Sequence, residues 1–134
     1  MEEDCIFCSI IRGEAECVKI TETENAVVFL DVCPVTKGHC LIVPKYHAQY
    51  LHQLPEEEVS QIGPLLVKIA KALDVKDYNV LQNNGTKANQ GVPHVHFHII
   101  PKTDHGGLEL HYTSTTDEVH HLRNTAQEIR TRLS

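Results

Sequence analysis

The chain has 134 residues, of which 41% are hydrophobic, so it is long enough for one domain with an ordinary core. Its formal net charge of −6 argues against an electrostatic surface for nucleic acid or for a membrane. The sequence contains no apolar run of about 18 residues, so it predicts no transmembrane helix. The acidic start MEEDC has no hydrophobic signal region. We therefore expect a cytoplasmic protein, also nuclear if its source is eukaryotic, whose five cysteines are thiols or ligands rather than disulfides.

The first third of the chain predicts a short helix and three strands. The segment CIFCSIIRGE, residues 5–14, suggests a cysteine knuckle and then a helical turn that ends at Gly13. Residues 17–23 and 26–32 are rich in strand formers and are separated by Glu24-Asn25, which predicts a hairpin. Residues 39–45, HCLIVPK, predict a third strand that ends at Pro44.

Residues 54–75 predict a single long helix. Pro55 stands at its start, three glutamates fill the first turn, and Gly63-Pro64 predicts a kink. Apolar residues then recur at helical spacing: Val59, Ile62, Leu66, Ile69 and Leu73.

The last part of the chain predicts two strands and a closing helix. Residues 78–85 form the first strand, and residues 86–91 form a loop before the second. After a loop over 103–117, a helix over 117–133 is expected, capped by Thr116 or Asp117. This order of elements predicts an α+β fold with a mainly antiparallel sheet in a single domain, residues 1–134.

Three histidines alternate with apolar residues in the segment GVPHVHFHIIPK, residues 91–102. Successive side chains of a strand point to opposite faces, so His94, His96 and His98 should share one face, stepped by roughly 6.6 to 7 Å. The opposite face would carry Val95, Phe97 and Ile99. Pro93 and Pro101 should bracket the strand, because proline is tolerated at strand ends.

Other interpretations of the three histidines remain open at this point. A strand face can expose histidine without function, and two histidines at i and i+2 can share one zinc ion. All three span roughly 13 Å, too far to converge on one ion at roughly 2 Å each. The scattered histidines are expected to face solvent: His52, His105, His111, His120 and His121.

A polar loop precedes the histidine segment and suits an anion. Gly85 and Gly91 permit close backbone approach, and free N–H groups there can form a concavity for phosphate. An imidazole beside it can attack phosphorus to give a phosphohistidine-type intermediate, while its neighbours stabilise charge on the oxygens. No GxxxxGK[ST] motif is present, so this is not a P-loop protein.

The segment HVHFHII resembles the signature of the histidine triad (HIT) family, in which three histidines alternate with apolar residues. The segments VVFLDVCPVTKGHCLIVPKYH and NNGTKANQGVPHVHFHIIPK are similar to the two nucleotide-binding segments of that family. With the CIFC start, the resemblance covers roughly residues 5–102, and residues 103–134 form a C-terminal loop and helix. The chain looks most like the Hint branch of purine nucleoside phosphoramidases, with the Fhit branch of dinucleoside polyphosphate hydrolases as the alternative.

The resemblance implies roles for the triad and for the nucleotide site. His96 matches the nucleophile, His98 a ligand of phosphate oxygens, and His94 the residue that orients and tunes the nucleophile. Asp31 matches the carboxylate that holds the ribose hydroxyls, although it could instead cap the following turn. Asn83, near ribose and phosphate, could instead be a simple hairpin residue. The remaining matches are Val32, which contacts base and sugar, and the phosphate-binding turn of Asn89, Gln90 and Gly91.

The implied activity is cleavage of nucleoside 5′-phosphoramidates, such as adenosine 5′-monophosphoramidate, to AMP and an amine through a nucleotidyl-histidine intermediate. A non-catalytic nucleotide-binding adaptor is the alternative outside the enzyme class. Family members in this branch usually have Gly-Gln-Ser or Gly-Gln-Thr where this chain has Asn89-Gln90-Gly91, and the animal proteins end in a short tail with Trp. A homodimer is also expected, from the wide apolar stripe of the 54–75 helix and from the resemblance.

Cys5 and Cys8 form a Cys-x-x-Cys pair that is compatible with a redox motif, a zinc half-site or chance. No strand precedes Cys5, which argues against a thioredoxin-like motif. Microbial members of the family combine such a pair with the histidine after IVPK and the first triad histidine. That resemblance implies a structural zinc site of Cys5, Cys8, His47 and His94, with His39 as a competing ligand. The other three cysteines are expected to be plain buried thiols: Cys17, Cys33 and Cys40.

Overall fold

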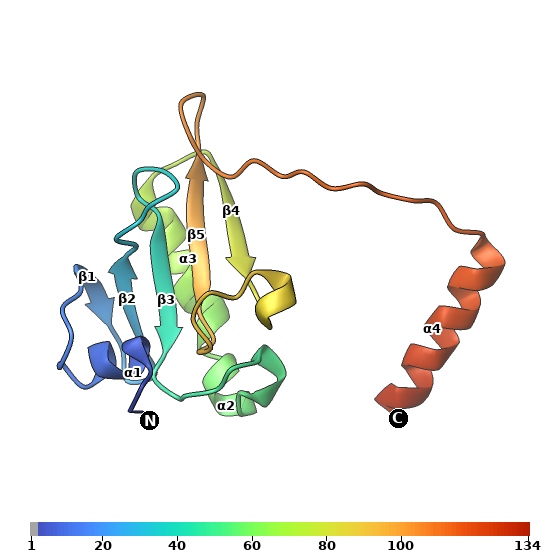
Figure 1. Ribbon diagram of the computed structural model, residues 1–134, viewed down its shortest axis with the longest axis horizontal. Helices are drawn as coiled ribbons and strands as arrows, with labels where there is room; N and C mark the ends of the chain where they lie inside the picture. The colour runs from blue at the N-terminus through green and yellow to red at the C-terminus, as the bar shows by residue number, and fades with distance from the viewer. Residues whose placement is uncertain (1–2) are drawn as a thin grey trace.

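The fold is built on an antiparallel sheet. In the computed structural model, which describes residues 3–134, five strands pair antiparallel throughout in the order β1-β2-β3-β5-β4 (Figure 1). The strands are β1 Lys19–Glu22, β2 Ala26–Leu30, β3 Cys40–Pro44, β4 Asp77–Gln82 and β5 Phe97–Lys102. The helices are α1 Ile6–Ile11, α2 Glu56–Val59, α3 Ile62–Leu73 and α4 Val119–Leu133, with 3₁₀ turns at Leu51–Gln53 and Thr86–Ala88. The predicted α+β class, the hairpin of β1 and β2, and the antiparallel sheet are confirmed.

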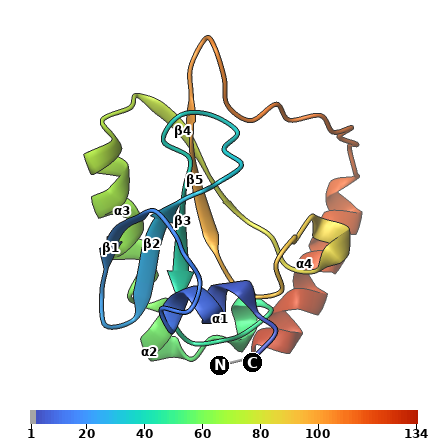
Figure 2. The same ribbon diagram turned by 60° about the vertical axis from the view of Figure 1, so that its left-hand side comes forward.

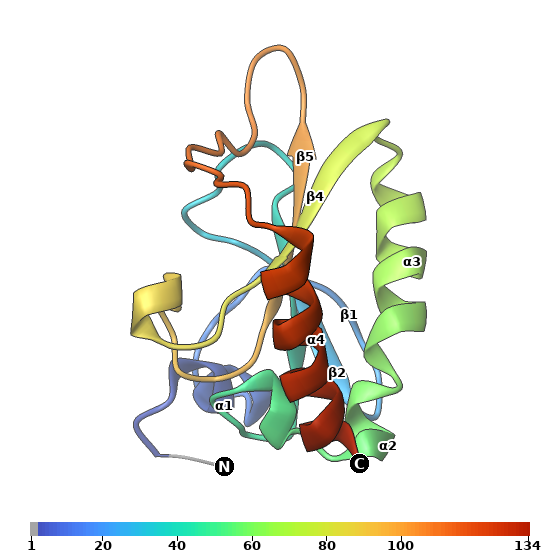
Figure 3. The same ribbon diagram turned by 90° about the vertical axis from the view of Figure 1, so that its right-hand side faces the viewer.

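Helices and loops cover both faces of the sheet, which explains the unbroken apolar runs of β2 and β3. Val28 and Ile42 face α3 and pack with its Ile69, whereas Val27 and Phe29 face the other way. On that second face the strands meet α1, from which Phe7 is buried. Figures 2 and 3 show α1 and α3 on opposite sides of the strands. The central strands of the sheet are therefore covered on both faces.

The helix predicted over 54–75 is two helices. The short α2 begins after Pro55, as predicted, and ends at Val59, and α3 begins at Ile62. Pro64 has no backbone N–H to donate to the carbonyl of Ser60, so the helical ladder cannot run through this point. The proline therefore breaks the helix rather than kinking it, and only α3 packs its apolar stripe on the sheet.

The histidine strand is displaced by three residues from its predicted position. The strand β5 begins at Phe97, so neither His94 nor His96 belongs to it. The backbone N–H of Val95 donates instead to the carbonyl of Ala48, 2.8 Å away. At its other end β5 includes Pro101, which pairs with β4 but lies beyond the last pair with β3. A missing N–H is tolerated there because one side of the strand has no ladder partner.

The C-terminal segment leaves the body of the protein. Residues 108–118 run as an extended arm to α4, which stands apart from the sheet (Figures 1 and 2). The N-cap of α4 is Glu118, not Thr116 or Asp117, and it makes no side-chain capping bond. Asp117 instead accepts hydrogen bonds from the Glu118 N–H and from the ring of His121. Over residues 3–134 no helix has the length and apolarity needed to cross a membrane; Met1 and Glu2 of the acidic start lie outside the described residues.

Candidate active site

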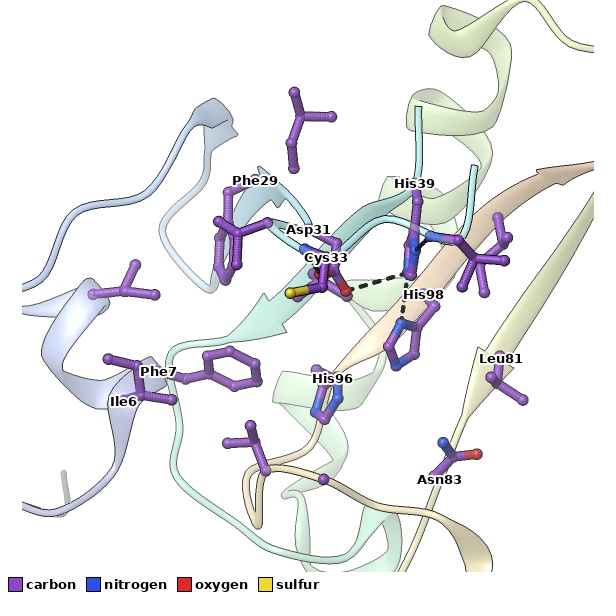
Figure 4. Close-up of a pocket in the computed structure, with 18 of the residues that line it drawn as sticks. Ile6, Phe7, Phe29, Asp31, Cys33, His39, Leu81, Asn83, His96 and His98 are labelled. Carbon is purple, nitrogen blue, oxygen red and sulfur yellow. Dashed lines mark hydrogen bonds and ion pairs between the residues drawn. The ribbon is translucent and has the colours of Figure 1, made fainter. Parts of the chain in front are cut away.

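A cavity of about 840 Å³ opens on the sheet face that carries α1 (Figure 4). It is formed by α1, the end of β2 with its following loop, β5, and the loop that precedes β5. Seven of the sequence-predicted nucleotide residues line it: Asp31, Val32, Asn83, Asn89, Gly91, His96 and His98. Residues from four separate stretches of sequence therefore meet in one pocket.

The ring of His96 is fixed by the backbone of the triad itself. Its Nδ1 donates to the carbonyl oxygen of His94, 2.7 Å away, and Phe7 makes a T-shaped contact with the ring at 4.9 Å between centroids. A proton on Nδ1 leaves the Nε2 lone pair of a neutral ring free. Burial lowers the pKa of His96 below its ordinary value, so the ring is neutral at pH 7. His96 thus presents an unprotonated nitrogen beside the cavity.

His98 lies next to His96, with 4.9 Å between the two ring centroids. Burial lowers the pKa of His98 to about 4, and its histidine neighbours His96 and His39 add to the shift. The Nδ1 of His98 is 2.9 Å from Nε2 of His39. His39 in turn lies 3.4 Å from a carboxylate oxygen of Asp31, as the dashed lines of Figure 4 show.

Asp31 has two roles that involve different oxygens. Its Oδ1 accepts the backbone N–H of Cys33 at 2.8 Å, so the alternative interpretation of Asp31 as a turn cap is correct for that oxygen. Its Oδ2 faces His39, and the residue also lines the cavity. One carboxylate thus shapes the loop after β2 and offers negative charge to the pocket.

Two predicted site residues are outside the cavity lining. The Gln90 side chain is buried and both ends of its amide are engaged, because Oε1 accepts the N–H of Gly85 and Nε2 donates to the carbonyl of Gln49. Its side chain therefore ties the loop together rather than facing a ligand. His94 is completely buried, and it bonds His96 through its carbonyl oxygen and not through its ring. The three rings therefore do not form the evenly stepped row that a strand over 94–98 predicts.

Several lining residues escaped the sequence analysis. Ile6 and Phe7, the two apolar residues between the cysteines, form one wall with Phe29 of β2. The apolar character of these two residues within CIFC is the one sequence feature that indicates a buried or ligand-facing role. The sequence predicts His39 only as a competing metal ligand, yet its ring contacts His98 across 59 positions of sequence.

The cluster of Cys5, Cys8, His47 and His94 comes together as predicted, and their ligand atoms all lie within 4.8 Å of one another. His94 Nδ1 is 3.3 Å from Cys5 Sγ, 3.7 Å from Cys8 Sγ and 3.0 Å from His47 Nδ1. Bonds of 2.0 to 2.3 Å to a tetrahedral ion place ligand atoms roughly 3.3 to 3.8 Å apart, so the two distances from His94 to the thiols fit a metal and the two imidazoles would have to separate by a few tenths of an ångström. His39 is not a member of this cluster.

The tautomer of His94 also suits a ligand. Its Nε2 donates to the carbonyl of Pro44 at 2.7 Å, which leaves the lone pair on Nδ1, the atom that faces the two thiols. Such a hydrogen bond from the second ring nitrogen is the usual partner of a metal-bound histidine. These residues can therefore hold a metal ion between α1, the segment after β3 and the segment before β5.

The remaining cysteines and histidines are only partly as predicted. Cys40 is buried, Cys17 is half-buried, and Cys33 is exposed in the loop after β2, so the prediction of a buried thiol is wrong for Cys33. That loop leaves the covered part of the sheet and turns outward at the rim of the cavity. The scattered histidines are exposed as expected: His52, His105, His111, His120 and His121.

Comparison with known proteins places this geometry in a family. The HIT domain family matches residues 12–105. The chain is 44% identical over 130 residues to an adenosine 5′-monophosphoramidase of Schizosaccharomyces pombe, covering 96% of this chain and 98% of the relative. It is 48% identical over 104 residues to the enzyme of the same name from Saccharomyces cerevisiae, covering 78% and 66%.

Solved structures agree with the sequence comparison over nearly the whole chain. A HIT family protein from Bacillus anthracis superposes with a TM-score of 0.93 at 37% identity and covers all of both chains. A histidine triad nucleotide-binding protein from Candida albicans gives a TM-score of 0.91 at 39% identity, with 97% of each chain covered. With its alternating histidines, its pocket and these relatives, the chain belongs to the HIT domain family.

Proposed function

We propose that the protein hydrolyses nucleoside 5′-phosphoramidates, such as adenosine 5′-monophosphoramidate, to the nucleoside monophosphate and an amine. The proposal rests on the hydrogen bonding of His96. Its Nδ1–H is bound to a carbonyl oxygen, which leaves the Nε2 lone pair free beside the cavity. Relatives named adenosine 5′-monophosphoramidases, at 44% and 48% identity, support the choice of substrate.

The proposed reaction has two displacements at phosphorus. Nε2 of His96 attacks the phosphorus, the P–N bond of the substrate breaks, and the amine leaves with its bonding pair and takes up a proton. Water then attacks the nucleotidyl-histidine, the P–Nε2 bond breaks, and the nucleoside monophosphate leaves. His98 donates a hydrogen bond to a non-bridging oxygen, where charge increases in both steps.

The walls of the cavity suit the two ends of a nucleotide. Ile6, Phe7 and Phe29 offer apolar and aromatic surface for a base, next to the exposed Val32. Asp31 supplies a carboxylate for ribose hydroxyls. The polar side holds the phosphate and consists of Asn83, Asn89, the backbone at Gly91, His96 and His98.

Turnover of adenosine 5′-monophosphoramidate by the purified protein tests the proposal. His96→Ala should abolish turnover, because no other ring offers an attacking nitrogen at that position. His52→Ala, which removes an exposed histidine, is the matched control and should keep full activity. Full activity of the His96→Ala protein would contradict the assignment of the nucleophile.

Two competing functions predict different results in the same assay. A Fhit-like hydrolase would cleave diadenosine polyphosphates with a higher kcat/KM than the phosphoramidate. A nucleotide-binding adaptor would bind AMP tightly and turn over neither substrate. Trapping a covalent nucleotidyl adduct on the native chain, absent from His96→Ala, distinguishes the proposed enzyme from the adaptor.

We also propose that the cluster of Cys5, Cys8, His47 and His94 binds one structural zinc ion. Two thiolates and two imidazoles fill a tetrahedron, so no open position is left for water, and the ion takes no part in the reaction. The site joins α1, which packs Phe7 on His96, to the segment that carries the triad. Cys5→Ser should lose zinc by elemental analysis but keep some turnover, whereas His96→Ala should keep zinc and lose turnover.

A homodimer is the third proposal, and α4 supports it. Its apolar residues recur at positions i, i+3, i+10 and i+14, and all are about half-exposed or more: Val119, Leu122, Ile129 and Leu133. The helix carries three arginines and one glutamate, while the whole chain has a net charge of −6. A basic amphipathic helix on an extended arm therefore complements the acidic surface of a second copy.

Light scattering at micromolar concentration tests the dimer. The native protein should give twice the 15.1 kDa mass of one chain, and Leu122→Glu should shift the distribution toward the single chain. Asn124→Glu, which adds the same charge on the opposite face of the helix, is the matched control. A native mass of one chain would contradict the proposal.

A further inference from the structure

His39 connects the backbone of the loop after β2 to the triad. The residue directly precedes β3, and its side chain is only 3% exposed. Both of its ring nitrogens are engaged: Nδ1 lies 3.0 Å from the backbone nitrogen of Val35, and Nε2 lies 2.9 Å from Nδ1 of His98. Figure 4 shows the two rings side by side with His98 turned toward His96.

The backbone determines which nitrogen of His39 carries the proton. A backbone N–H can only donate, so Nδ1 of His39 must accept the bond from Val35 and cannot carry a proton. Burial lowers the pKa of His39 below its ordinary value despite the opposing charge of Asp31, which keeps the ring neutral. The single proton of the neutral ring is then on Nε2, the nitrogen that faces His98 and Asp31.

The proton on His39 determines the tautomer of the next ring. Between two imidazole nitrogens 2.9 Å apart, one must donate and the other accept, so Nδ1 of His98 is the acceptor. We propose that His39 is a positioning residue that holds His98 with its lone pair on Nδ1 and its proton on Nε2, directed to the substrate phosphate. This inference rests on the proposed function, because it assigns His98 to the phosphate.

We call the two hydrogen bonds from Val35 to His39 and from His39 to His98 the relay. The relay gives His98 a role opposite to that of His96, although both are neutral imidazoles. His96 is held by a carbonyl acceptor, which puts the proton on Nδ1 and the lone pair on Nε2. His98 is held by a donor, which puts the lone pair on Nδ1 and the proton on Nε2. One ring can therefore attack phosphorus while its neighbour donates to a phosphoryl oxygen, with no proton transfer needed beforehand.

Asp31 supports this arrangement from the side. Its Oδ2 lies 3.4 Å from Nε2 of His39, longer than the 2.9 Å to His98, so the carboxylate is the weaker acceptor and favours a proton on the same nitrogen. The atoms of Asp31, His39 and His98 are also close enough together to hold a cation. A cation would require Nε2 of His39 to be unprotonated, so the position of that proton distinguishes the two interpretations.

Imidazole nitrogen–proton correlation spectra of the ¹⁵N-histidine-labelled full chain test the relay directly. We expect the native protein to show Nε2 protonated and Nδ1 unprotonated in both His39 and His98, and the reverse in His96. A proton on Nδ1 of His98 would overturn the proposal, as would an unprotonated Nε2 of His39. These spectra are read without substrate, so they stand even if the phosphoramidase activity itself is absent.

A pair of variants tests whether the donated bond matters for turnover. His39→Leu removes the donor and leaves the buried Nδ1 of His98 unpaired, so kcat should fall roughly tenfold or more with little change in KM. His39→Gln places an amide N–H near the former Nε2 and should recover most of that loss. The control His52→Leu should leave kcat unchanged. Equal loss in His39→Leu and His39→Gln would overturn the relay, and the native spectra decide the case if His39→Leu does not fold.

Discussion

His98 should make folding stability depend on pH in the weakly acidic range. Burial lowers its pKa from the ordinary 6.5 to about 4, so the folded chain keeps this ring neutral where the unfolded chain protonates it. Below pH 6.5 the unfolded state therefore binds one more proton than the folded state. The free energy of unfolding must fall as the pH drops from about 6.5 to about 4 and then level off.

The size of the effect follows from the shift. Each pH unit between the two pKa values costs about 1.4 kcal/mol, which gives roughly 2 kcal/mol between pH 7 and pH 5. The ring lines an open cavity and is only partly buried, so solvent screening reduces the expected value to roughly 1 to 2 kcal/mol.

Comparison with His98→Asn isolates this contribution. Asparagine does not titrate, and its amide oxygen lies near the former Nδ1, where it can accept the bond from His39. Urea unfolding at pH 7 and pH 5 gives the loss of stability for each protein. The native chain should lose about 1 to 2 kcal/mol more than the variant, and equal losses would show that His98 is not buried as the fold implies.

Three further predictions concern the fold that supports the site. Cys8→Ser removes a thiol 3.3 Å from Nδ1 of His47, so bound metal and Tm should both fall, as elemental analysis and calorimetry would show; a full metal complement would refute the site. Ile42→Ala leaves a cavity at a completely buried position and should cost about 2 to 5 kcal/mol in urea unfolding. Gly107→Ala should lower the free energy of unfolding, because φ is +126° and the new Cβ would lie 2.9 Å from Cα of Lys102. Gly63→Ala in α3 is the contrasting change: its Cβ meets nothing within 4 Å, so the free energy of unfolding should rise by roughly 0.5 to 1 kcal/mol.

The sequence alone determined those features of the site that depend on local pattern. Alternation of residues 94–99 put Val95 and Phe97 in the core beside α3, as their burial confirms, and the resemblance to the HIT family and the α+β fold were both correct. The spacing of Cys5 and Cys8 marked a half-site, and the family pattern supplied the two histidines that complete the cluster. Such signals survive because periodicity and short motifs require nothing from distant parts of the chain.

Only the tertiary structure decided what each imidazole does. The proton of His94 is directed by a carbonyl 50 positions away, and that of His98 by its bond to a ring 59 positions away. The start of β5 at Phe97 was equally inaccessible, because the segment before it bonds Ala48 instead of a neighbouring strand. A ring nitrogen donates or accepts according to the partner it meets, and that partner is set by long-range packing rather than by neighbours in the sequence.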